Sequence, residues 1–463
     1  MSRDRECTRP DVGPPPRGLA WLPALVLYQL VFVVLAVAYT PLLAWRLASR
    51  RRYRGGVLER IGFVPKTTGA QPVLWIHAVS VGELKAARRL IEAIAARGEY
   101  EVVVSSTTPT GRSLARLLYP SLRTFYYPFD LGPCPWLALR RVRPAAVLLV
   151  ELEYWPNFLF CAARRGIPVA VVNGRISERS YRGYRRIRGL LPPFEAIARF
   201  CMQDESYRQR LLGLGVDPAR IFVSGNMKYD AVTLHREPAR AGDLRRWLSR
   251  DGRPVLVCGS THGDEERLLL AARAQVEAAL QRPVRLVLVP RHPERASSVR
   301  DEITALGCPC VRWSEVGGAL PALESKSVVL VDTIGHLESF YGACDVAYVG
   351  GSLVPRGGQN MLEPAALGRA VVFGPYTTNF RNDVELLLGA GGAIQVASAE
   401  GLVATLLALL RDPTEAQELG KRAVGLIERN QGATTRTLDL LDEVLGRPPA
   451  LQAAESGSPH EAR

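Results

Sequence analysis

The sequence predicts an α/β protein with two doubly wound domains in tandem and a membrane-anchoring helix before them. Apolar strand-like runs alternate with helical stretches over most of the chain, which is typical of βαβ units and of parallel sheets covered on both faces. A polar, irregular stretch near residues 231–242 divides this alternation into two parts. The run 19–45 carries no charged residue and is long enough to cross a bilayer as a helix.

The chain is long and basic. Its 463 residues exceed what one ordinary core holds and suit two domains. The formal net charge of +14 favours acidic partners, such as nucleic acid, anionic lipid or phosphorylated small molecules. The 8 cysteines are scattered, and Cys308 and Cys310 form a C-x-C without a second pair at zinc spacing. We therefore expect mostly buried, reduced thiols in a cytoplasmic body, and no metal site.

A tail over residues 1–18 precedes the predicted membrane anchor, residues 19–48. Trp21 and Trp45 lie near the two ends of the uncharged run, where membrane interfaces favour tryptophan. The denser arginine cluster follows the run, so the positive-inside rule puts the body of the chain in the cytoplasm. A cleaved signal peptide is the alternative, but the run is too long and no small-residue cleavage site closes it. Two prolines within the run leave a kinked or partly interfacial helix open.

The first α/β domain is predicted over residues 49–235 and the second over 236–446, with a disordered tail over 447–463. Helices are expected at 83–97, 110–120, 155–166 and 265–280. Strands are expected at 73–79, 101–107, 145–152, 168–174 and 220–226, and then at 254–260, 285–291, 327–332, 346–351, 370–375 and 393–396. No G-x-G-x-x-G fingerprint is present. Ligands of open α/β sheets bind outside the carboxyl ends of the strands, so side chains that follow strands are the site candidates.

The first candidate is Glu83, which follows the strand at 73–79. Ser80 to Glu83 read S-V-G-E and match the capping box S/T-x-x-E. A catalytic role is also consistent with this position, because Gly82 allows a tight turn and the helix dipole favours the ionised carboxylate that a general base needs. The sequence leaves both roles open. His77, near the same strand end, is either a ligand group or, more often in such a place, a hydrogen-bonded structural histidine.

Three more charged groups follow strands in the first domain. Glu151 and Glu153 alternate around Leu152, and period-two geometry would place both carboxylates on one side. A structural pair bonded to amides or arginines is the alternative. Lys228 follows the strand at 220–226, where a cation suits a phosphate or a sugar carboxylate, unless it is simply exposed.

Residues 173–189 contain six arginines. Such a run is usually a solvated helix face. Beside a membrane anchor it also suits lipid head groups or a phosphorylated acceptor, at about 1 kcal/mol per basic residue near an anionic surface.

In the second domain, Ser260 and Thr261 are predicted to open a helix whose free amides hold an anion, with a simple cap as the alternative. Arg291 and His292 end another strand, where arginine suits a phosphate or a base edge. The most specific stretch is 348–368, in which a strand runs into a series of glycines. Glycines admit close approach of the backbone to a phosphate, and a carboxylate on the following helix can take both ribose hydroxyls.

Seven sequence blocks, in order, resemble the 3-deoxy-D-manno-octulosonic acid (Kdo) transferases of lipopolysaccharide assembly. They are WIHAVSVGE, ELEYWPN, VNGRISERS, GNMKYD, GSTHGDEE, VPRHPER and GGSLVPRGGQNMLEP, and the resemblance runs from the anchor to about residue 435. It implies a GT-B fold, in which two Rossmann-like domains face a cleft, with an N-terminal acceptor side and a C-terminal nucleotide side. It also implies inverting, metal-independent transfer of Kdo from CMP-Kdo to a tetraacylated, bisphosphorylated lipid A precursor. The resemblance further implies that no cofactor and no nucleic acid take part, and that the enzyme works on the cytoplasmic side of the anionic inner membrane of a Gram-negative bacterium.

By the same resemblance, Glu83 is the general base, and Glu153 and Lys228 stabilise the transition state near the breaking bond. The predicted nucleotide contacts combine those implied by the resemblance with the strand-end candidates of the second domain. They are Ser260, Thr261, Pro290, Arg291, His292, Ile334, Gly335, His336, Gly351, Ser352, Asn360, Met361, Leu362 and Glu363.

The sequence departs from the family pattern at two places. The family usually has Met-Gly-Glu where this chain has Ile334-Gly335-His336, and Gly-Gly-His-Asn where it has Gly357-Gly358-Gln359-Asn360. The first departure removes a carboxylate near the nucleotide, which puts the tightness and pH dependence of donor binding in question. Two other functions stay open. A UDP-sugar glycosyltransferase or epimerase would bind UDP rather than CMP, and a membrane-tethered scaffold without turnover would not need Glu83 and Lys228.

Overall fold

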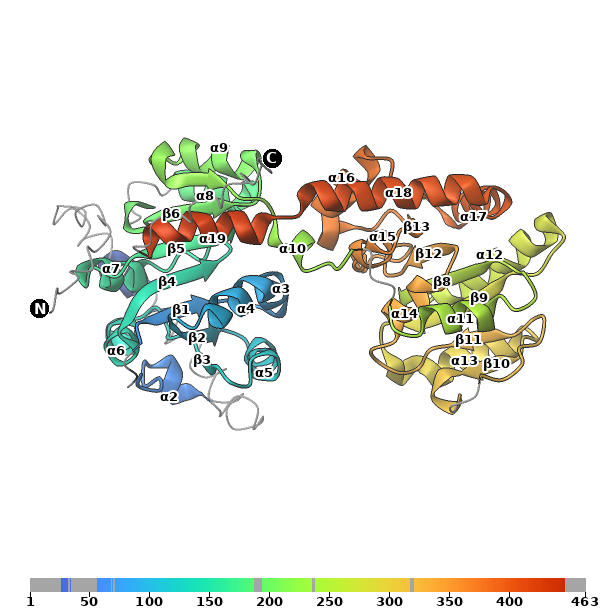
Figure 1. Cartoon of the computed structure of the whole chain (residues 1–463), viewed down its shortest axis with the longest axis horizontal. Coiled ribbons are helices and arrows are strands. Elements are labelled where there is room, and N and C mark those ends of the chain that lie inside the picture. Colours follow the sequence, from blue (N-terminus) through green and yellow to red (C-terminus); the bar gives the residue numbers. More distant parts are fainter. Residues whose placement is uncertain are drawn as a thin grey trace, which may run out of the picture. The chain divides into compact units, whose positions relative to one another are not determined.

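The computed structural model describes residues 26–31, 34, 56–67, 69, 71–186, 194–234, 238–316 and 320–445. The chain forms two compact units, one from residues 1–231 with 430–463 and the other from 232–429. Each unit contains an open sheet of seven strands, and the paired strands are all parallel. Helices cover both faces of each sheet (Figure 1), which confirms the predicted pair of doubly wound domains.

The sheet of the first unit has the strand order β3-β2-β1-β4-β5-β6-β7. Alternate residues of β1 enter different cores, since Val73 and Trp75 pack in one cluster and Leu74 and Ile76 in the other. The strands are β1 (Val73–His77), β2 (Glu101–Ser106), β3 (Arg123–Tyr126), β4 (Pro144–Val150), β5 (Val169–Gly174), β6 (Arg199–Met202) and β7 (Ile221–Val223). The helices are α2 (Val57–Arg60), α3 (Val81–Ala86), α4 (Arg88–Arg97), α5 (Pro109–Leu118), α6 (Pro133–Val142), α7 (Pro156–Arg164), α8 (Glu178–Arg186), α9 (Glu205–Gly213), α10 (Met227–Asp230) and α19 (Ala433–Val444).

The sheet of the second unit has the strand order β10-β11-β9-β8-β12-β13-β14. Its strands are β8 (Val255–Thr261), β9 (Arg285–Pro290), β10 (Cys310–Arg312), β11 (Val328–Leu330), β12 (Val346–Val349), β13 (Ala370–Phe373) and β14 (Ala393–Gln395). Its helices are α11 (Ala241–Leu248), α12 (Glu265–Leu280), α13 (Ala296–Ala305), α14 (Leu337–Gly342), α15 (Leu362–Ala366), α16 (Arg381–Gly389), α17 (Ala399–Arg411) and α18 (Pro413–Asn430).

The last helix corrects the predicted domain boundary at residue 446. After α18 the chain returns to the first unit, where α19, at the red end of the sequence colours in Figure 1, packs on β5 and β6. Ala433 and Leu441 of α19 enter the same apolar cluster as Leu74 of β1. The buried carboxylate of Asp230 accepts hydrogen bonds from Gly432 N (2.7 Å) and Thr434 N (2.5 Å) and so holds the start of α19. The first unit is therefore formed by the N-terminal part of the chain together with the C-terminal helix α19.

Most of the predicted anchor, residues 19–48, lies outside the described residues, as do the tails 1–18 and 447–463. Residues 26–31 and 34 are helical. Within the described ranges, none of the helices combines the length and the apolar character needed to cross a membrane. Seven of the cysteines are described, and all are free thiols, of which Cys201, Cys258 and Cys344 are buried.

Candidate active site

Some of the predicted site residues follow the two strands that meet at the switch point of each sheet, where the strand order reverses. Others, such as Lys228 and Arg291, follow other strands. In the first unit this point lies between β1 and β4, which precede Glu83 and Glu153. In the second unit it lies between β8 and β12, which precede Glu265 and Gly351. Ligands of open parallel sheets bind beside such points.

Glu83 caps the N-terminus of α3 and is held in one orientation. The hydroxyl of the N-cap residue Ser80 accepts a hydrogen bond from Glu83 N (3.4 Å) and donates one to Glu83 Oε1 (2.8 Å). Val79 N donates to the other carboxylate oxygen, Oε2, at 2.7 Å. Glu83 is only 7% exposed. The capping role is therefore confirmed, and it fixes the carboxylate at the carboxyl end of β1.

Glu151 and Glu153 lie beyond the end of their strand, so the predicted period-two alternation is wrong. β4 ends at Val150, and Glu151 has a φ of 61°, which no strand residue adopts. This left-handed turn redirects the chain, and Glu151 pairs with Arg175 (Oε2 to Nε, 2.5 Å). Both carboxylates nevertheless interact electrostatically with Glu83, so the sheet edge carries a group of three acidic side chains.

Burial and mutual repulsion raise the pKa of two of these carboxyl groups, Glu83 and Glu153. Burial raises the pKa of Glu83, and the charge of Glu151 adds to the effect, while the hydrogen bonds from Ser80 and Val79 oppose it. Burial and the charges of Glu83 and Glu151 raise the pKa of Glu153 to about 7. Glu153 can therefore exchange a proton near neutral pH, and a raised pKa makes Glu83 a stronger base, as general acid–base catalysis requires.

His77 has the structural role that the sequence left open. Its ring is completely buried and stacks on Tyr127, with 3.8 Å between ring centres. Nδ1 lies 2.9 Å from Ser105 Oγ and 3.2 Å from Ser105 O. Burial lowers the pKa of His77 to about 3, so the imidazole is neutral and holds β1 against β2.

Lys228 belongs to the short helix α10, which packs against α3, the helix of Glu83. The turn before α10 is held by Asn226, whose Oδ1 accepts from Lys228 N at 3.0 Å. Asn173 supports it from the end of β5, because its Oδ1 accepts from Met227 N at 2.9 Å. Asn173 is 1% exposed and has a φ of 53°. Asn173 was not predicted as a site residue, although an asparagine near the end of an apolar strand was the available signal.

In the second unit, Ser260 and Thr261 do not open a helix, so that prediction is wrong. Both belong to β8, and α12 begins only at Glu265. Thr261 is fully buried, and its hydroxyl donates to Glu266 Oε1 at 2.8 Å. Contact of these two residues with a nucleotide stays a prediction.

The carboxylate of Glu265 binds the backbone amides of the turn that follows β12. Glu265 is completely buried, and its Oε1 accepts from Tyr348 OH (2.8 Å), Ser352 N (3.0 Å) and Leu353 N (2.9 Å). Its Oε2 accepts from Gly351 N (2.7 Å) and His262 N (2.9 Å). The successive amides form an anion-binding nest around Gly351, whose φ is +68°. The amides expected to meet a phosphate are therefore already occupied.

Arginine and histidine side chains lie near this turn. Arg291 and His292 follow β9 and are exposed, and the ring of His262 lies 5.6 Å from that of His292. Burial lowers the pKa of His262, and the charges of His292, Arg356 and Arg291 lower it further, against the opposing effect of Glu265. Gln359, at one of the two departures from the family pattern, lies with Nε2 3.2 Å from His262 Nε2.

The remaining predicted contacts differ in what they can present to a ligand. Ile334 is 85% exposed, and Gly335 and His336 lead into α14. Asn360 Nδ2 donates to Glu363 Oε1 at 3.1 Å at the start of α15. The side chains of Pro290, Met361 and Leu362 are buried, so a ligand would meet mainly their backbone.

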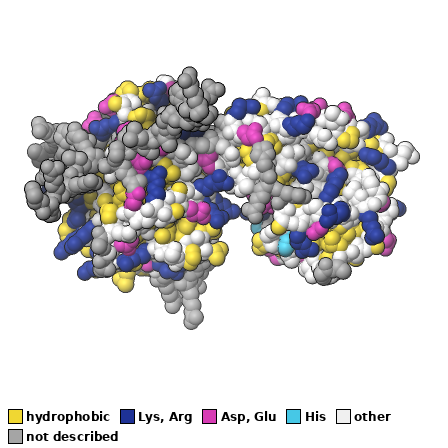
Figure 2. Space-filling model, in the orientation of Figure 1, with side chains coloured by type: hydrophobic (Ala, Val, Ile, Leu, Met, Phe, Trp, Pro, Cys, Tyr) yellow, Lys and Arg dark blue, Asp and Glu magenta, His cyan; other side chains and the backbone are white. Residues whose placement is uncertain are grey.

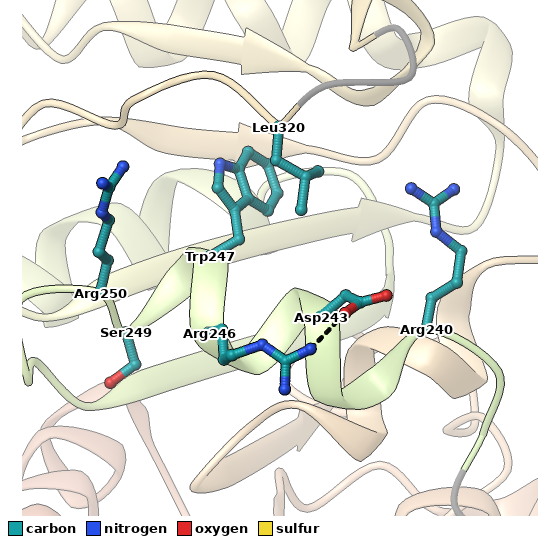
Figure 3. Close-up of a pocket in the computed structure, with 7 residues that line it drawn as sticks. All are labelled: Arg240, Asp243, Arg246, Trp247, Ser249, Arg250 and Leu320. Carbon is teal, nitrogen blue, oxygen red and sulfur yellow. Dashed lines mark hydrogen bonds and ion pairs between the residues drawn. The ribbon is translucent and has the colours of Figure 1, made fainter.

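An open depression lies along α11 and holds none of the predicted site residues. Its lining residues are Arg240, Asp243, Arg246, Trp247, Ser249, Arg250 and Leu320 (Figure 3). Arg246 is paired with Asp243 at 2.5 Å. Among the described residues, no three His, Cys, Asp or Glu side chains are grouped as a metal ion would require.

The two parallel units with polar switch points resemble the GT-B class, which contains glycosyltransferases and related sugar-nucleotide enzymes. A solved structure of a putative UDP-N-acetylglucosamine 2-epimerase from Listeria monocytogenes matches 81% of this chain and 96% of its own, with a TM-score of 0.52. The two sequences are 16% identical, so this likeness concerns the fold alone.

The sequence relatives define the family. A family model described as 3-deoxy-D-manno-octulosonic-acid transferase matches residues 55–231. The 3-deoxy-D-manno-octulosonic acid transferase of Bordetella pertussis is 34% identical over 422 residues, which cover 87% of this chain and 95% of the relative. That of Haemophilus influenzae is 34% identical over 403 residues, which cover 86% and 93%. The chain belongs to the Kdo transferase family and is a glycosyltransferase, so the scaffold without turnover is set aside.

Proposed function

We propose that this enzyme transfers Kdo from CMP-Kdo to a tetraacyldisaccharide bisphosphate precursor of lipid A. Transfer inverts the anomeric centre, uses no metal ion or cofactor, and takes place on the cytoplasmic face of a Gram-negative inner membrane. The observation that carries the proposal is the buried, oriented carboxylate of Glu83 at the switch point of the first unit. Family membership supports the sugar that is transferred.

Glu83 is proposed as the general base. The acceptor is an alcohol, which becomes a competent nucleophile only as a base takes its proton. The acceptor oxygen bonds to the anomeric carbon of Kdo, its proton moves to Glu83, and the bond from that carbon to CMP breaks. Within the described part of the chain, the carboxylate accepts two hydrogen bonds, whereas a carboxylate has about four acceptor positions. Glu83 therefore keeps capacity for the proton while Ser80 and Val79 hold it in place.

Glu153 and Lys228 are proposed to stabilise the transition state beside Glu83. The anomeric carbon develops positive charge as CMP leaves, and a carboxylate near it is favourable once ionised. With its pKa near 7, Glu153 gains or loses this charge close to working pH. Lys228, half-buried on α10, would neutralise an acidic group of the substrate.

CMP is proposed to bind at the switch point of the second unit. CMP leaves as an anion, so positive charge at its phosphate assists departure. Because Glu265 occupies the amides of Gly351 and Ser352, the phosphate depends mainly on side chains such as Arg291 and His292. Asn360 and Glu363 supply the polar groups for the ribose.

Membrane attachment is supported by the surface of the first unit. Trp136 on α6 is 43% exposed, with the guanidinium groups of Arg140 and Arg165 at 5.3 and 5.4 Å from its ring. Phe63 and Leu58 are 51% and 66% exposed on the same unit. Figure 2 shows hydrophobic and basic side chains side by side on its described surface. Aromatic rings flanked by arginine suit the interface of an anionic bilayer.

The test compares Glu83→Gln with wild type in transfer from CMP-Kdo to the lipid A precursor. Glutamine keeps the acceptor for Val79 N and donates to Ser80 Oγ, so the cap survives while the base is lost. We expect transfer to fall by about 10²- to 10⁴-fold, with CMP affinity and thermal stability unchanged. The matched control is Glu92→Gln, which alters an exposed glutamate paired with Arg88.

Normal transfer by Glu83→Gln would exclude the proposed base. A wild-type enzyme that binds UDP in preference to CMP would instead show that the donor is wrong and favour the UDP-sugar alternative.

A further inference from the structure

The segment between β4 and α7 carries a buried hydrogen-bond donor that the fold leaves unused. This segment joins the two elements at the carboxyl end of β4 (Figure 1) and contains Glu153 and, two residues later, Trp155. Trp155 Nε1 is buried and has no hydrogen-bond partner of ordinary geometry among the described residues. Buried N–H groups without an acceptor are rare in native proteins, so a function for this donor is expected.

The start of α7 holds the backbone of Trp155 without using its side chain. Trp155 is the N-cap residue, and its carbonyl oxygen accepts from Leu159 N at 2.9 Å. The indole makes no cap hydrogen bond. Asp130 caps the helix instead, because its Oδ2 accepts from Asn157 N (3.0 Å) and its Oδ1 from Phe158 N (2.7 Å). The indole N–H is thus not needed for the helix start.

The aromatic neighbours of the indole do not accept its proton either. The ring centre of Trp155 lies 5.9 Å from that of Tyr127, and Tyr127 stacks on His77 at 3.8 Å. Within the described part of the chain, Tyr127 OH and His77 Nε2 are buried and have no hydrogen-bond partner. The indole N–H instead acts on Glu153, where it opposes the rise in pKa that burial causes. The unused donor and the carboxyl group are therefore neighbours.

The other influences on Glu153 disfavour its negative charge. Burial is the largest cause of its raised pKa, followed by the charges of Glu83 and Glu151. Further titratable or charged groups around these carboxyl groups are Tyr127 after β3, Tyr184 on α8, Arg175 after β5 and Lys228 on α10. Of the described groups that determine the pKa of Glu153, the indole N–H alone favours the ionised form.

We propose that Trp155 is a positioning residue for Glu153, and that its indole N–H donates to the Glu153 carboxylate when this group is ionised. A hydrogen bond to an ionised acceptor is about twice as strong as one between neutral groups, so the donor engages mainly the charged form. The proposed transfer needs that form near the anomeric carbon, where positive charge develops. This role of Trp155 rests on the proposed function of Glu153 and adds the residue that stabilises its charge.

The first test uses the fluorescence of Trp155 as a reporter and needs neither donor nor acceptor substrate. Indole emission responds to a nearby charge and to a hydrogen bond at the N–H, so ionisation of Glu153 should change it. The full-length chain, purified in detergent, is titrated across neutral pH. We expect a transition in wild type with a midpoint at about pH 7. It should be absent from Trp155→Phe, which keeps an aromatic ring without the N–H, and from Glu153→Gln.

The matched control for this titration is Trp136→Phe, because the chain has 7 tryptophans and Trp136 is 43% exposed on α6. This variant should keep the transition. A transition that persists in Glu153→Gln would come from another group, such as Asp130, whose pKa burial raises to about 6, and would overturn the proposal. A transition that persists in Trp155→Phe would do the same. Glu153→Gln leaves the indole in place, so it decides the question even if Trp155→Phe folds poorly.

The second test is the pH profile of transfer from CMP-Kdo by wild type and Trp155→Phe. The rising limb of kcat/KM reports Glu153 together with Glu83. Without the donor the pKa of Glu153 rises, and the midpoint of the limb should move up by as much as about one pH unit. Transfer at neutral pH should then fall by up to about fivefold and equal wild type at alkaline pH, where Glu153 is ionised in both. A merely structural role would lower transfer by the same factor at every pH and would refute the proposal.

The two tests also separate the contact from the proposed function. The expected fluorescence transition with an unchanged pH profile would establish the contact of Trp155 with Glu153 and refute the role of Glu153 in transfer. A missing transition in wild type would refute the contact, whatever the pH profile shows.

Discussion

Replacing Glu265 with glutamine should destabilise the second unit severely, although the two side chains have the same shape. The carboxylate accepts five hydrogen bonds, three on Oε1 and two on Oε2. An amide nitrogen at the Oε2 position would face the N–H groups of Gly351 and His262. At the Oε1 position it would face three donors. At least two donors thus lose their acceptor in either orientation.

The cost follows from the number of orphaned donors. A buried donor without a partner costs about 1–3 kcal/mol, so two of them cost about 4 kcal/mol. For a unit that spans residues 232–429, each kcal/mol lowers Tm by about 2–4 °C, and the fall is roughly 12 °C. The neighbour Asp264 provides a control, because it lies at the same helix start and its side chain makes no cap hydrogen bond. Asp264→Asn removes one charge without disturbing the nest.

The assay is urea unfolding of the full-length variants, with CMP titration alongside. Glu265→Gln should unfold at lower urea and also bind CMP more weakly, because the turn after β12 loses its support. Asp264→Asn should match wild type in both measurements. A loss below about 1 kcal/mol for Glu265→Gln would show that the amides are satisfied in another way and would refute the nest as the element that holds this turn.

Three further perturbations test other parts of the structure. Glu153→Gln should stabilise the first unit at pH 8 by at most about 3 kcal/mol in urea unfolding. The native pKa of Glu153 is about 7, above its ordinary value of 4.5, so the wild-type protein loses stability as the pH rises from 4.5 to 7 and the variant does not. A gain that did not vanish near pH 4.5 would contradict this cause. Asp230→Ala should release α19, cost about 2–4 kcal/mol, and admit protease cleavage after residue 430; unchanged resistance would mean that apolar packing alone holds the helix. Arg291→Ala should weaken CMP binding at least tenfold and reduce its salt dependence, whereas the exposed Arg300→Ala should do neither in calorimetry at two salt concentrations.

Much of the fold follows from local sequence, and the exceptions have a physical reason. The strands with long Val, Ile and Leu runs are all predicted, because strands of buried parallel sheets are apolar on both faces. β3, β6 and β10 are not, since each has only three or four residues and contains an arginine. Their extended state comes from pairing with β2, β5 and β11. The helix α19 was not predicted, and a helical pattern would in any case carry no information on which sheet the helix covers.

The candidate site, too, could be predicted from the sequence only in part. The rule that ligands meet strand ends is enough to locate Glu83, Glu153 and Arg291 in the sequence. It cannot find the role of Glu265, because four of its five partners lie more than 80 residues away in the chain. It also fails for the geometry of Glu151, whose positive φ ends the strand where a regular alternation would continue.

In both units a glutamate of the protein binds backbone amides at the switch point, and the number of donors separates their roles. Among the described residues, Glu83 accepts two hydrogen bonds and is 7% exposed, so it is fixed in orientation yet retains acceptor positions for a proton. Glu265 accepts five and is fully buried, which uses all of its acceptor capacity. The first arrangement suits chemistry and the second suits support. Since the nest is filled, the proposed binding of CMP would rely on arginine and histidine side chains, and donor binding should therefore weaken with salt.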